Sequence, residues 1–166
     1  IDVGKTTTKL IVVTNGIPHY VTTLDIGGHA LTLAVVKYFG VSEEEAKKVK
    51  LERGIVPGVG NEEYLAAMIS TVSVIRDEIL TRLEYWQSHA KEGSTHQPVS
   101  RAVLVGGNAT VLGLPEYLET SLKIPVVLGD SFLNFAPKQV WLPPLNYTES
   151  LAYGTAIGLA LREYVT

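Results

Sequence analysis

The sequence predicts an α/β fold with a mixed sheet and a helical insertion over about residues 42–90. Three observations support this prediction. Residues 102–105 form a short apolar run that ends in a Gly-Gly-Asn turn, as a buried strand followed by a tight turn would. An Asn-Gly pair at residues 15–16 separates two further apolar runs and is typical of a two-residue hairpin. Segments with helical periodicity lie between these strands.

The composition is that of an ordinary soluble globular protein, with 46% hydrophobic residues, 19% charged residues and a formal net charge of −3. Because there is no basic field, nucleic acid is not expected as a partner. The chain has no cysteine, which excludes a disulfide, a thiolate zinc site and a cysteine nucleophile. Its apolar stretches are much shorter than the roughly 18–20 residues of a membrane span, so we expect no direct membrane span.

The N-terminal quarter predicts a hairpin followed by a helix. The sequence starts directly on the tail of a strand, and we therefore expect it to be a piece of a longer protein. Residues 8–14 and 17–25 are the two strands on either side of the Asn-Gly pair. Gly27-Gly28 ends the hairpin, and we expect it to have a structural role. Residues 30–39 then form a helix that stops at a glycine, which readily adopts the left-handed conformation.

The helical insertion has recognisable start and stop signals. Ser42 followed by Glu45 is a capping box, and Gly54 ends the helix that it begins. Asn61 begins a long helix that reaches about Ala90. Its apolar positions recur every three or four residues and form one stripe: Leu65, Ile69, Val72, Ile75, Ile79, Leu83 and Trp86. We expect this stripe to pack against the preceding helices and to connect the helical lobe to the sheet.

The last third of the chain returns to strands and helices. Pro115 lies at the start of a helix, where its missing N–H has no cost. Residues 124–128 form a short strand, and residues 134–147 are mostly irregular. Residues 150–164 form the last helix, with glycine and alanine positions that give it small faces. The four histidines are scattered without the spacing of metal ligands: His19, His29, His89 and His96.

Three motifs together resemble the actin-like ATPase superfamily. IDVGKTTTKLIVV resembles its second phosphate-binding strand-turn-strand, VLVGGNATVLGL its adenosine motif, and AYGTAIGLAL the helix that closes its second half. Within the superfamily, EEEAKKVKLERGIVPG and EYLAAMISTVSVIRDEILTRLEYW are most similar to PilM, the type IV pilus assembly family, which is itself similar to the FtsA cell-division family. The resemblance implies the second half only. Residues 1–41 and 91–166 would be the subdomain IIA core, and residues 42–90 the subdomain IIB helical insertion.

The resemblance also implies a site for ATP and Mg²⁺. Asp2 matches the acidic residue that orders magnesium near the phosphates, and a carboxylate is a ligand that Mg²⁺ favours. The alternative is an aspartate that caps its own turn. Gly4, Lys5, Thr6 and Thr7 match the hairpin whose amides and hydroxyls face the β- and γ-phosphates. Many family members have further glycines where this chain has Lys5, whose amine points either at the phosphates or into solvent.

The adenosine motif implies the rest of the binding site. Gly106, Gly107 and Asn108 match the turn in which bare backbone lets the base and the ribose lie against the chain. We expect Asp2 and Gly106-Gly107 to lie on neighbouring strand ends that face one crevice. Lys47 and Lys50 match polar positions around the adenine and the ribose. The alternative is that both lysines are solvated cations at the C-terminal end of a helix, where a positive charge suits the helix dipole.

The leading functional expectation is a nucleotide-binding scaffold. In this expectation, ATP closes the two lobes of the whole protein, and the protein recruits PilN-like inner-membrane pilus assembly proteins from the cytoplasmic side. We also expect that it can self-associate. One alternative is an FtsA-like cytoskeletal ATPase module. Another is a fragment of an actin-fold sugar or acid kinase, although no catalytic-base aspartate is identifiable in the segments present. We assign no catalytic residue, and we expect the chain alone to bind ATP weakly without hydrolysing it.

Overall fold

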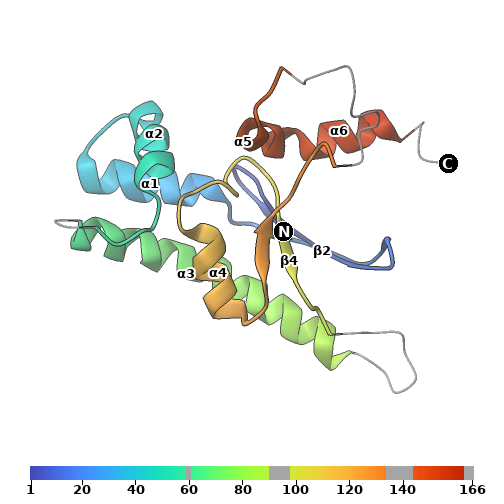
Figure 1. The fold of residues 1–166 in the computed structure, drawn as a ribbon. Helices are drawn as coiled ribbons and strands as arrows, with labels where there is room; N and C mark the ends of the chain where they lie inside the picture. The colour runs from blue at the N-terminus through green and yellow to red at the C-terminus, as the bar shows by residue number, and fades with distance from the viewer. Residues whose placement is uncertain (59–60, 90–97, 134–143, 163–166) are drawn as a thin grey trace.

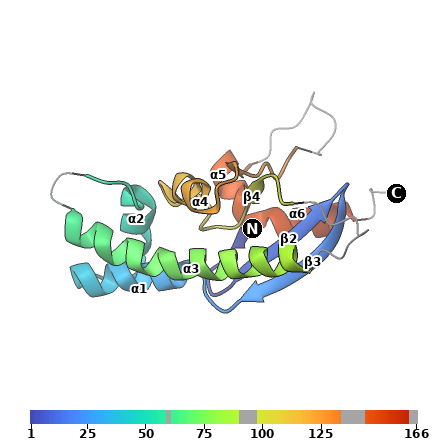
Figure 2. The same cartoon turned by 90° about the horizontal axis from the view of Figure 1, so that it is seen from below.

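The computed structural model describes residues 1–58, 61–89, 98–133 and 144–162 (Figure 1). Its elements in chain order are β1 (Asp2–Val3), β2 (Thr8–Thr14), β3 (Ile17–Leu24), α1 (Gly28–Phe39), α2 (Glu43–Arg53), α3 (Glu62–Ser88), β4 (Ala102–Leu104), α4 (Leu114–Leu122), β5 (Val126–Leu128), α5 (Tyr147–Ser150), the 3₁₀ turn η1 (Leu151–Tyr153) and α6 (Gly154–Leu161). Helices α1 and α2 lie at one side of the molecule, the hairpin β2–β3 lies at the other, and α3 runs between them (Figure 2).

The strands of the described residues form one mixed sheet in the order β3-β2-β1-β4-β5. The first three pair antiparallel, and β4 pairs parallel with β5. The two groups join where Asp2 pairs in parallel with Val105. There the Val3 amide donates to the Val105 carbonyl (2.8 Å), and the Val105 amide donates to the Ile1 carbonyl (2.9 Å). The predicted α/β class with a mixed sheet is confirmed, and the parallel pairing brings the C-terminal ends of β1 and β4 to one edge.

The local signals of the first half act as predicted. The hairpin turn has positive φ at both central residues, Asn15 (52°) and Gly16 (79°), as an Asn-Gly pair favours. Helix α1 begins at Gly28, two residues before the predicted start, and ends at the predicted left-handed glycine. The capping box of α2 is present, because the Ser42 hydroxyl accepts from the Glu45 amide and the Glu45 carboxylate accepts from the Ser42 amide.

The apolar stripe of α3 is confirmed in its middle and at its end, and shifted at its start. Its fully buried residues are Tyr64, Met68, Val72, Ile75, Ile79 and Trp86. Leu65, Ile69 and Leu83, which the prediction placed in the stripe, are half-buried. A hydrogen bond explains the shift of the buried face. The Tyr64 hydroxyl donates to the Gly54 carbonyl (2.9 Å), so the face of α3 that carries Tyr64 points to the interior in the first helical turns.

Helix α3 connects the helical lobe to the sheet, as the sequence predicts. Its first half packs along α1. At its other end the centroid of the Trp86 ring lies 6.1 Å from that of Tyr20 on β3. Figure 2 shows the helix passing from α1 and α2 to the hairpin in one unbroken run. The helical lobe and the sheet therefore share one apolar core, which includes Leu10, Leu31, Ile75 and Leu104.

The prediction of one helix over residues 150–164 is wrong. Helical structure begins earlier, at Tyr147, because the Asn146 side chain accepts from the Glu149 amide (2.8 Å) and the Glu149 carboxylate accepts from the Asn146 amide (3.2 Å). The 3₁₀ turn then separates α5 from α6. At Gly158 an added Cβ would meet no described atom within 4 Å, so close packing does not use this small residue. Residues 134–143 and 163–164 of these predictions lie outside the described residues.

The substitution Val72→Asp tests the core position of α3. Val72 is completely buried, so the new carboxylate would be an unpaired charge in an apolar interior, at a cost of several kcal/mol. We expect the melting temperature to fall by about 10 °C. Val74→Asp is the matched control, because Val74 lies on the same helix with half of its surface exposed and should change little. A Val72→Asp melting temperature within about a degree of the wild type would show that the stripe is not core.

Candidate functional site

The ends of β1 and β4 lie directly against each other. Gly106, the first residue after the Val105 bridge, has a φ of 94°, which a side-chain-bearing residue rarely adopts. A Cβ at Gly106 would collide with the Asp2 carboxylate and lie 2.7 Å from the Val3 carbonyl oxygen. The predicted meeting of Asp2 with the turn at residues 106–108, here called the glycine turn, is therefore confirmed.

Asp2 is suited to magnesium, although its role as a ligand stays a prediction. Asp2 lies on β1, directly before the tip of the β1–β2 hairpin, residues 4–7, here called the hairpin tip. Mg²⁺ in nucleotide sites is commonly held by one or two carboxylates together with substrate phosphates and water. A single carboxylate fits that pattern. Within the described residues, no group of three or more histidine, aspartate or glutamate side chains could hold a metal without such a ligand.

The hairpin tip is held in place mainly by its carbonyls. The Gly4 amide donates to the Thr7 carbonyl (3.0 Å), which closes the turn. The carbonyls of Gly4 and Lys5 accept from the first amides of α1, those of Gly28 (3.0 Å) and His29 (2.8 Å). In the described part of the chain, the amides of Lys5, Thr6 and Thr7 donate to no other residue. Successive free amides of this kind are suited to an anion.

The Gly27-Gly28 pair allows α1 to approach both turns. A Cβ at Gly27 would lie 2.7–2.8 Å from the Lys5 and Gly4 carbonyl oxygens, and a Cβ at Gly28 would overlap the Asn108 side chain. Backbone contact at this distance requires glycine. The predicted structural role of the pair is confirmed.

Asn108 connects the glycine turn to the hairpin tip. Its side chain is almost fully buried, and its Nδ2 donates to the Gly4 carbonyl (2.8 Å) and the Val3 carbonyl (3.3 Å). Its Oδ1 accepts from the Lys50 amine at 2.6 Å. The side chain thus bonds to the end of β1 on one side and to α2 of the helical lobe on the other.

The two predicted lysines of α2 are in different environments. Lys50 is 5% exposed, and its Nζ donates to the Gly28 carbonyl (3.2 Å), the Thr32 hydroxyl (3.2 Å) and Asn108. The alternative of a solvated cation is therefore wrong for Lys50. Lys47 is exposed, as that alternative describes, and also faces the cavity described next. Contact of either lysine with a nucleotide stays a prediction.

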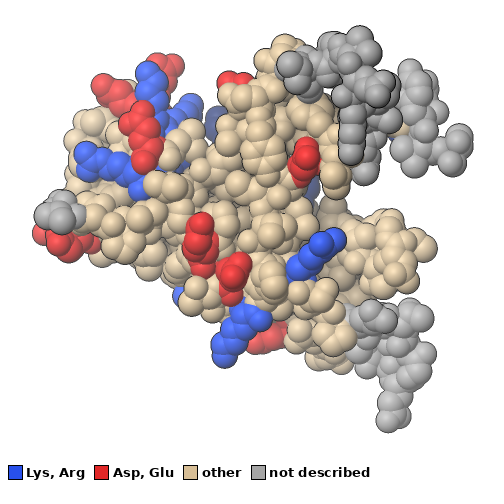
Figure 3. Space-filling view, in the orientation of Figure 1, with Lys and Arg blue, Asp and Glu red and all other residues tan. Residues whose placement is uncertain are grey.

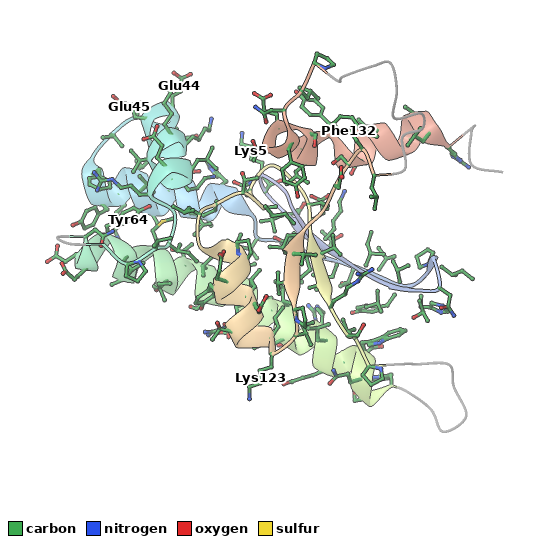
Figure 4. All side chains as sticks on the ribbon, in the orientation of Figure 1. Lys5, Glu44, Glu45, Tyr64, Lys123 and Phe132 are labelled. Atoms are coloured by element: carbon green, nitrogen blue, oxygen red, sulfur yellow. The ribbon has the colours of Figure 1, made fainter. Side chains whose placement is uncertain are left out.

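A cavity of about 220 Å³ lies between α2, the start of α1 and the glycine turn. It is lined by Lys5, His29, Thr32, Lys47, Lys50, Leu51, Gly107 and Asn108. No carboxylate belongs to this lining, so its charge is basic. Figure 4 shows Lys5 between α2 and α5, and in Figure 3 the surface is notched between the same two helices. A larger cavity of about 570 Å³, between β2 and residues 98–103, includes none of the predicted site residues.

The structure thus brings five of the predicted residues to one cavity and places the other five beside it. Lys5, Lys47, Lys50, Gly107 and Asn108 line the cavity. Gly4, Thr6, Thr7 and Gly106 belong to the two adjoining turns, and Asp2 lies on β1 against Gly106.

Sequence reasoning missed His29 and Thr32, which also line the cavity. The buried Nδ1 of His29 has no hydrogen-bond partner among the described residues and lies 4.0 Å from Glu43 Oε2. One available signal was the position of His29 directly after the glycine pair, in the first turn of a helix that faces the hairpin tip.

The substitution Gly106→Ala tests the contact between the strand ends. It forces a side chain into a left-handed conformation and against Asp2, and we expect a loss of about 2–4 kcal/mol in the free energy of unfolding. Gly107→Ala is the control in the same turn, because a Cβ there would meet only the Ala152 side chain, at an ordinary 3.5 Å. Urea unfolding of both variants measures the difference; equal losses would contradict the described geometry of the turn.

Lys50 gives a pH-dependent prediction. Burial, with a smaller contribution from the neighbouring charge of Lys47, lowers the pKa of Lys50 from 10.5 to about 8. Between about pH 8 and 10.5 the unfolded chain keeps a proton that the folded chain has released, so this group makes stability rise with pH in that window. In urea titrations the wild type should therefore gain stability relative to Lys50→Met between pH 8 and 10. If the two proteins followed parallel pH curves, the amine would not be buried.

Comparison with known proteins identifies the fold. The chain in a solved PilM–PilN type IV pilus biogenesis complex superimposes with a TM-score of 0.78 at 21% identity, over 97% of this chain and 44% of that one. MreB5 of Spiroplasma citri, solved with ADP bound, gives 0.65 at 15% identity, over 99% and 52%. The ethanolamine utilization protein EutJ of Carboxydothermus hydrogenoformans gives 0.61 at 20%, over 96% and 46%. These likenesses show the actin-like ATPase fold.

Sequence comparison identifies the family. The cell division protein FtsA of Borreliella burgdorferi is 26% identical over 145 residues, which are 78% of this chain and 35% of that protein. The chain thus spans about a third of FtsA and less than half of the matching chain in the solved pilus complex. Residues 1–164 match the family described as type IV pilus assembly protein PilM. Since this match covers nearly the whole chain, the protein belongs to the PilM family of type IV pilus assembly proteins.

Proposed function

We propose that this chain is the ATP-binding half, subdomains IIA and IIB, of a cytoplasmic scaffold for type IV pilus assembly. The observation that supports the proposal most is the basic cavity beside the glycine turn. It combines three lysines and a histidine with exposed backbone at Gly107, and it adjoins a hairpin tip in which, among the described residues, the amides of residues 5–7 have no acceptor. Cationic side chains and free amides together favour a polyphosphate over a neutral ligand.

Each part of the site has a separate task in this proposal. The adenosine lies against the glycine turn, where Gly107 offers no side chain. Lys47 and Lys50 lie on the ribose side. The amides of Lys5, Thr6 and Thr7 hold the phosphates, and Asp2 orders the magnesium ion. The bound nucleotide supplies a negatively charged bridge between the two lobes of the whole protein, and the chain provides one wall of that cleft.

The partner in this proposal is an inner-membrane pilus assembly protein. One solved relative of similar fold was determined as a PilM–PilN complex. We propose a PilN-like partner for the whole protein, which would hold it at the cytoplasmic face of the inner membrane. Across the described residues, every helix is too short or too polar to cross a membrane.

A second candidate function is a polymerising module of the FtsA kind, which the 26% identity with FtsA favours. The two candidates differ in self-association. A cytoskeletal module would sediment as filaments when ATP and Mg²⁺ are added, whereas a recruitment scaffold would stay small and bind its partner.

An NMR titration of the 166-residue chain with ATP and Mg²⁺ tests the proposed site. We expect a dissociation constant on the order of millimolar, equivalent to about −4 kcal/mol, because one wall of a cleft gives little enclosure. The backbone signals of Thr6, Gly107 and Asn108 should shift most, and no phosphate should be released. Shifts confined to β2 and residues 98–103 would place the ligand in the larger cavity and contradict the proposal. Micromolar affinity would show that the site is complete in this chain.

A further inference from the structure

Lys50 is the point at which the helical lobe, the glycine turn and the start of α1 meet. Its ammonium group has three N–H donors, and three acceptors from the protein surround it: Gly28 O, Thr32 Oγ1 and Asn108 Oδ1. The shortest of the three bonds, at 2.6 Å, goes to Asn108. With 5% of the residue exposed, the amine has neither a free donor nor open access to a ligand. These contacts distinguish Lys50 from the exposed Lys47 on the same helix.

The environment of Lys50 is costly for a charge. No carboxylate is among its partners or in the cavity lining, and the charges that face it, Lys47 on α2, Lys5 on the hairpin tip and His29 on α1 when protonated, have the same sign. A buried ammonium without a counter-ion contributes less to stability than an apolar side chain of the same volume. The presence of a lysine at this position is therefore better explained by a function of its amine than by a contribution to stability.

The bond from Lys50 fixes the orientation of the Asn108 amide. The ammonium can only donate, so the atom that faces it must be the amide oxygen. The amide nitrogen then faces the Val3 and Gly4 carbonyls, which can only accept. Every hydrogen-bonding group of Asn108 except one lone pair of Oδ1 is accounted for. Removal of the amine would leave a buried oxygen without its donor and would free the side chain to turn away from the hairpin tip.

We propose that Lys50 is a positioning residue: its amine holds Asn108, and through Asn108 it keeps the glycine turn in register with the hairpin tip, so that nucleotide affinity depends on the Lys50–Asn108 bond. This inference rests on the proposed function for its ligand. It assigns direct contact with the nucleotide to the exposed Lys47, and it makes the helical lobe part of the support of the phosphate site. The carbonyl of Gly4 accepts from both the Asn108 side chain and the Gly28 amide, so Asn108 and the start of α1 hold the same point of the hairpin tip.

A double-mutant cycle tests the proposal on the whole 166-residue chain. Lys50→Met, Asn108→Ala and the double variant are compared for ATP affinity by NMR titration and for stability by urea unfolding. Each single change should weaken ATP binding about fivefold, and the double variant should lose the same fivefold rather than about twenty-five-fold, because each single change already removes the Lys50–Asn108 bond on which affinity depends. Lys48→Met is the matched control, an exposed lysine on the same helix that should leave affinity unchanged. If the losses of the two single variants multiplied in the double variant, the proposal would be overturned.

The side-chain amide signals of Asn108 provide a readout that a general loss of stability would not move. In Lys50→Met these signals should shift and exchange faster with solvent, whereas in Lys48→Met they should match the wild type. Unchanged Asn108 signals in Lys50→Met would also overturn the proposal. If Lys50→Met fails to fold, Lys50→Gln, which keeps a donor without the charge, replaces it in the cycle.

The urea unfolding measurements allow a failure of this inference to be distinguished from a failure of the proposed function. If the wild-type chain binds no ATP, the proposed function fails and the nucleotide part of the inference fails with it. The coupling between Lys50 and Asn108 is then decided by urea unfolding alone, where additive losses would contradict it and a coupled loss would support it.

Discussion

The side-chain amide of Asn108 is the interaction on which the arrangement of the site depends. It bonds to carbonyls at the end of β1 and to a lysine of α2, which lies 58 residues before it in the chain. Without it the Val3 carbonyl and the Lys50 amine would each lose a partner in a largely buried place. The close approach of α1 depends on it as well, because Gly28 packs directly against this amide. Strand end, helix start and helical lobe are thus held together by one side chain.

Much of the fold follows from local signals that act within a few residues. The Asn15-Gly16 turn and the Ser42–Glu45 capping box appear where the sequence places them, because their hydrogen bonds and dihedral angles are satisfied by neighbours in the chain. Signals that depend on distant partners were less reliable. The buried face of α3 is turned toward Tyr64 because its hydroxyl finds the Gly54 carbonyl across a loop, and periodicity alone cannot show such a bond.

In the candidate site, too, some features could be predicted from the sequence and others depend on distant partners. Asp2 and Gly106 could be placed together from the sequence, since the C-terminal ends of neighbouring parallel strands meet at one edge of a sheet. The burial of Lys50 was not predicted, because its three acceptors come from α1 and from the glycine turn. One clue was present: Lys50 follows Ala46 by four residues and therefore shares the face of α2 on which Ala46 is fully buried. His29 was overlooked because a search for ligand spacing ignores a histidine that acts alone.

The length of α3 has a mechanical consequence. Its 27 residues form a rod of about 40 Å that packs on α1 near one end and meets Tyr20 of the hairpin with Trp86 at the other. A tilt of about 5° at the helical lobe would displace the far end of such a rod by about 3.5 Å. A rigid tilt of the helix at the helical lobe would therefore be enlarged by the length of the helix into a movement of several ångströms at the hairpin.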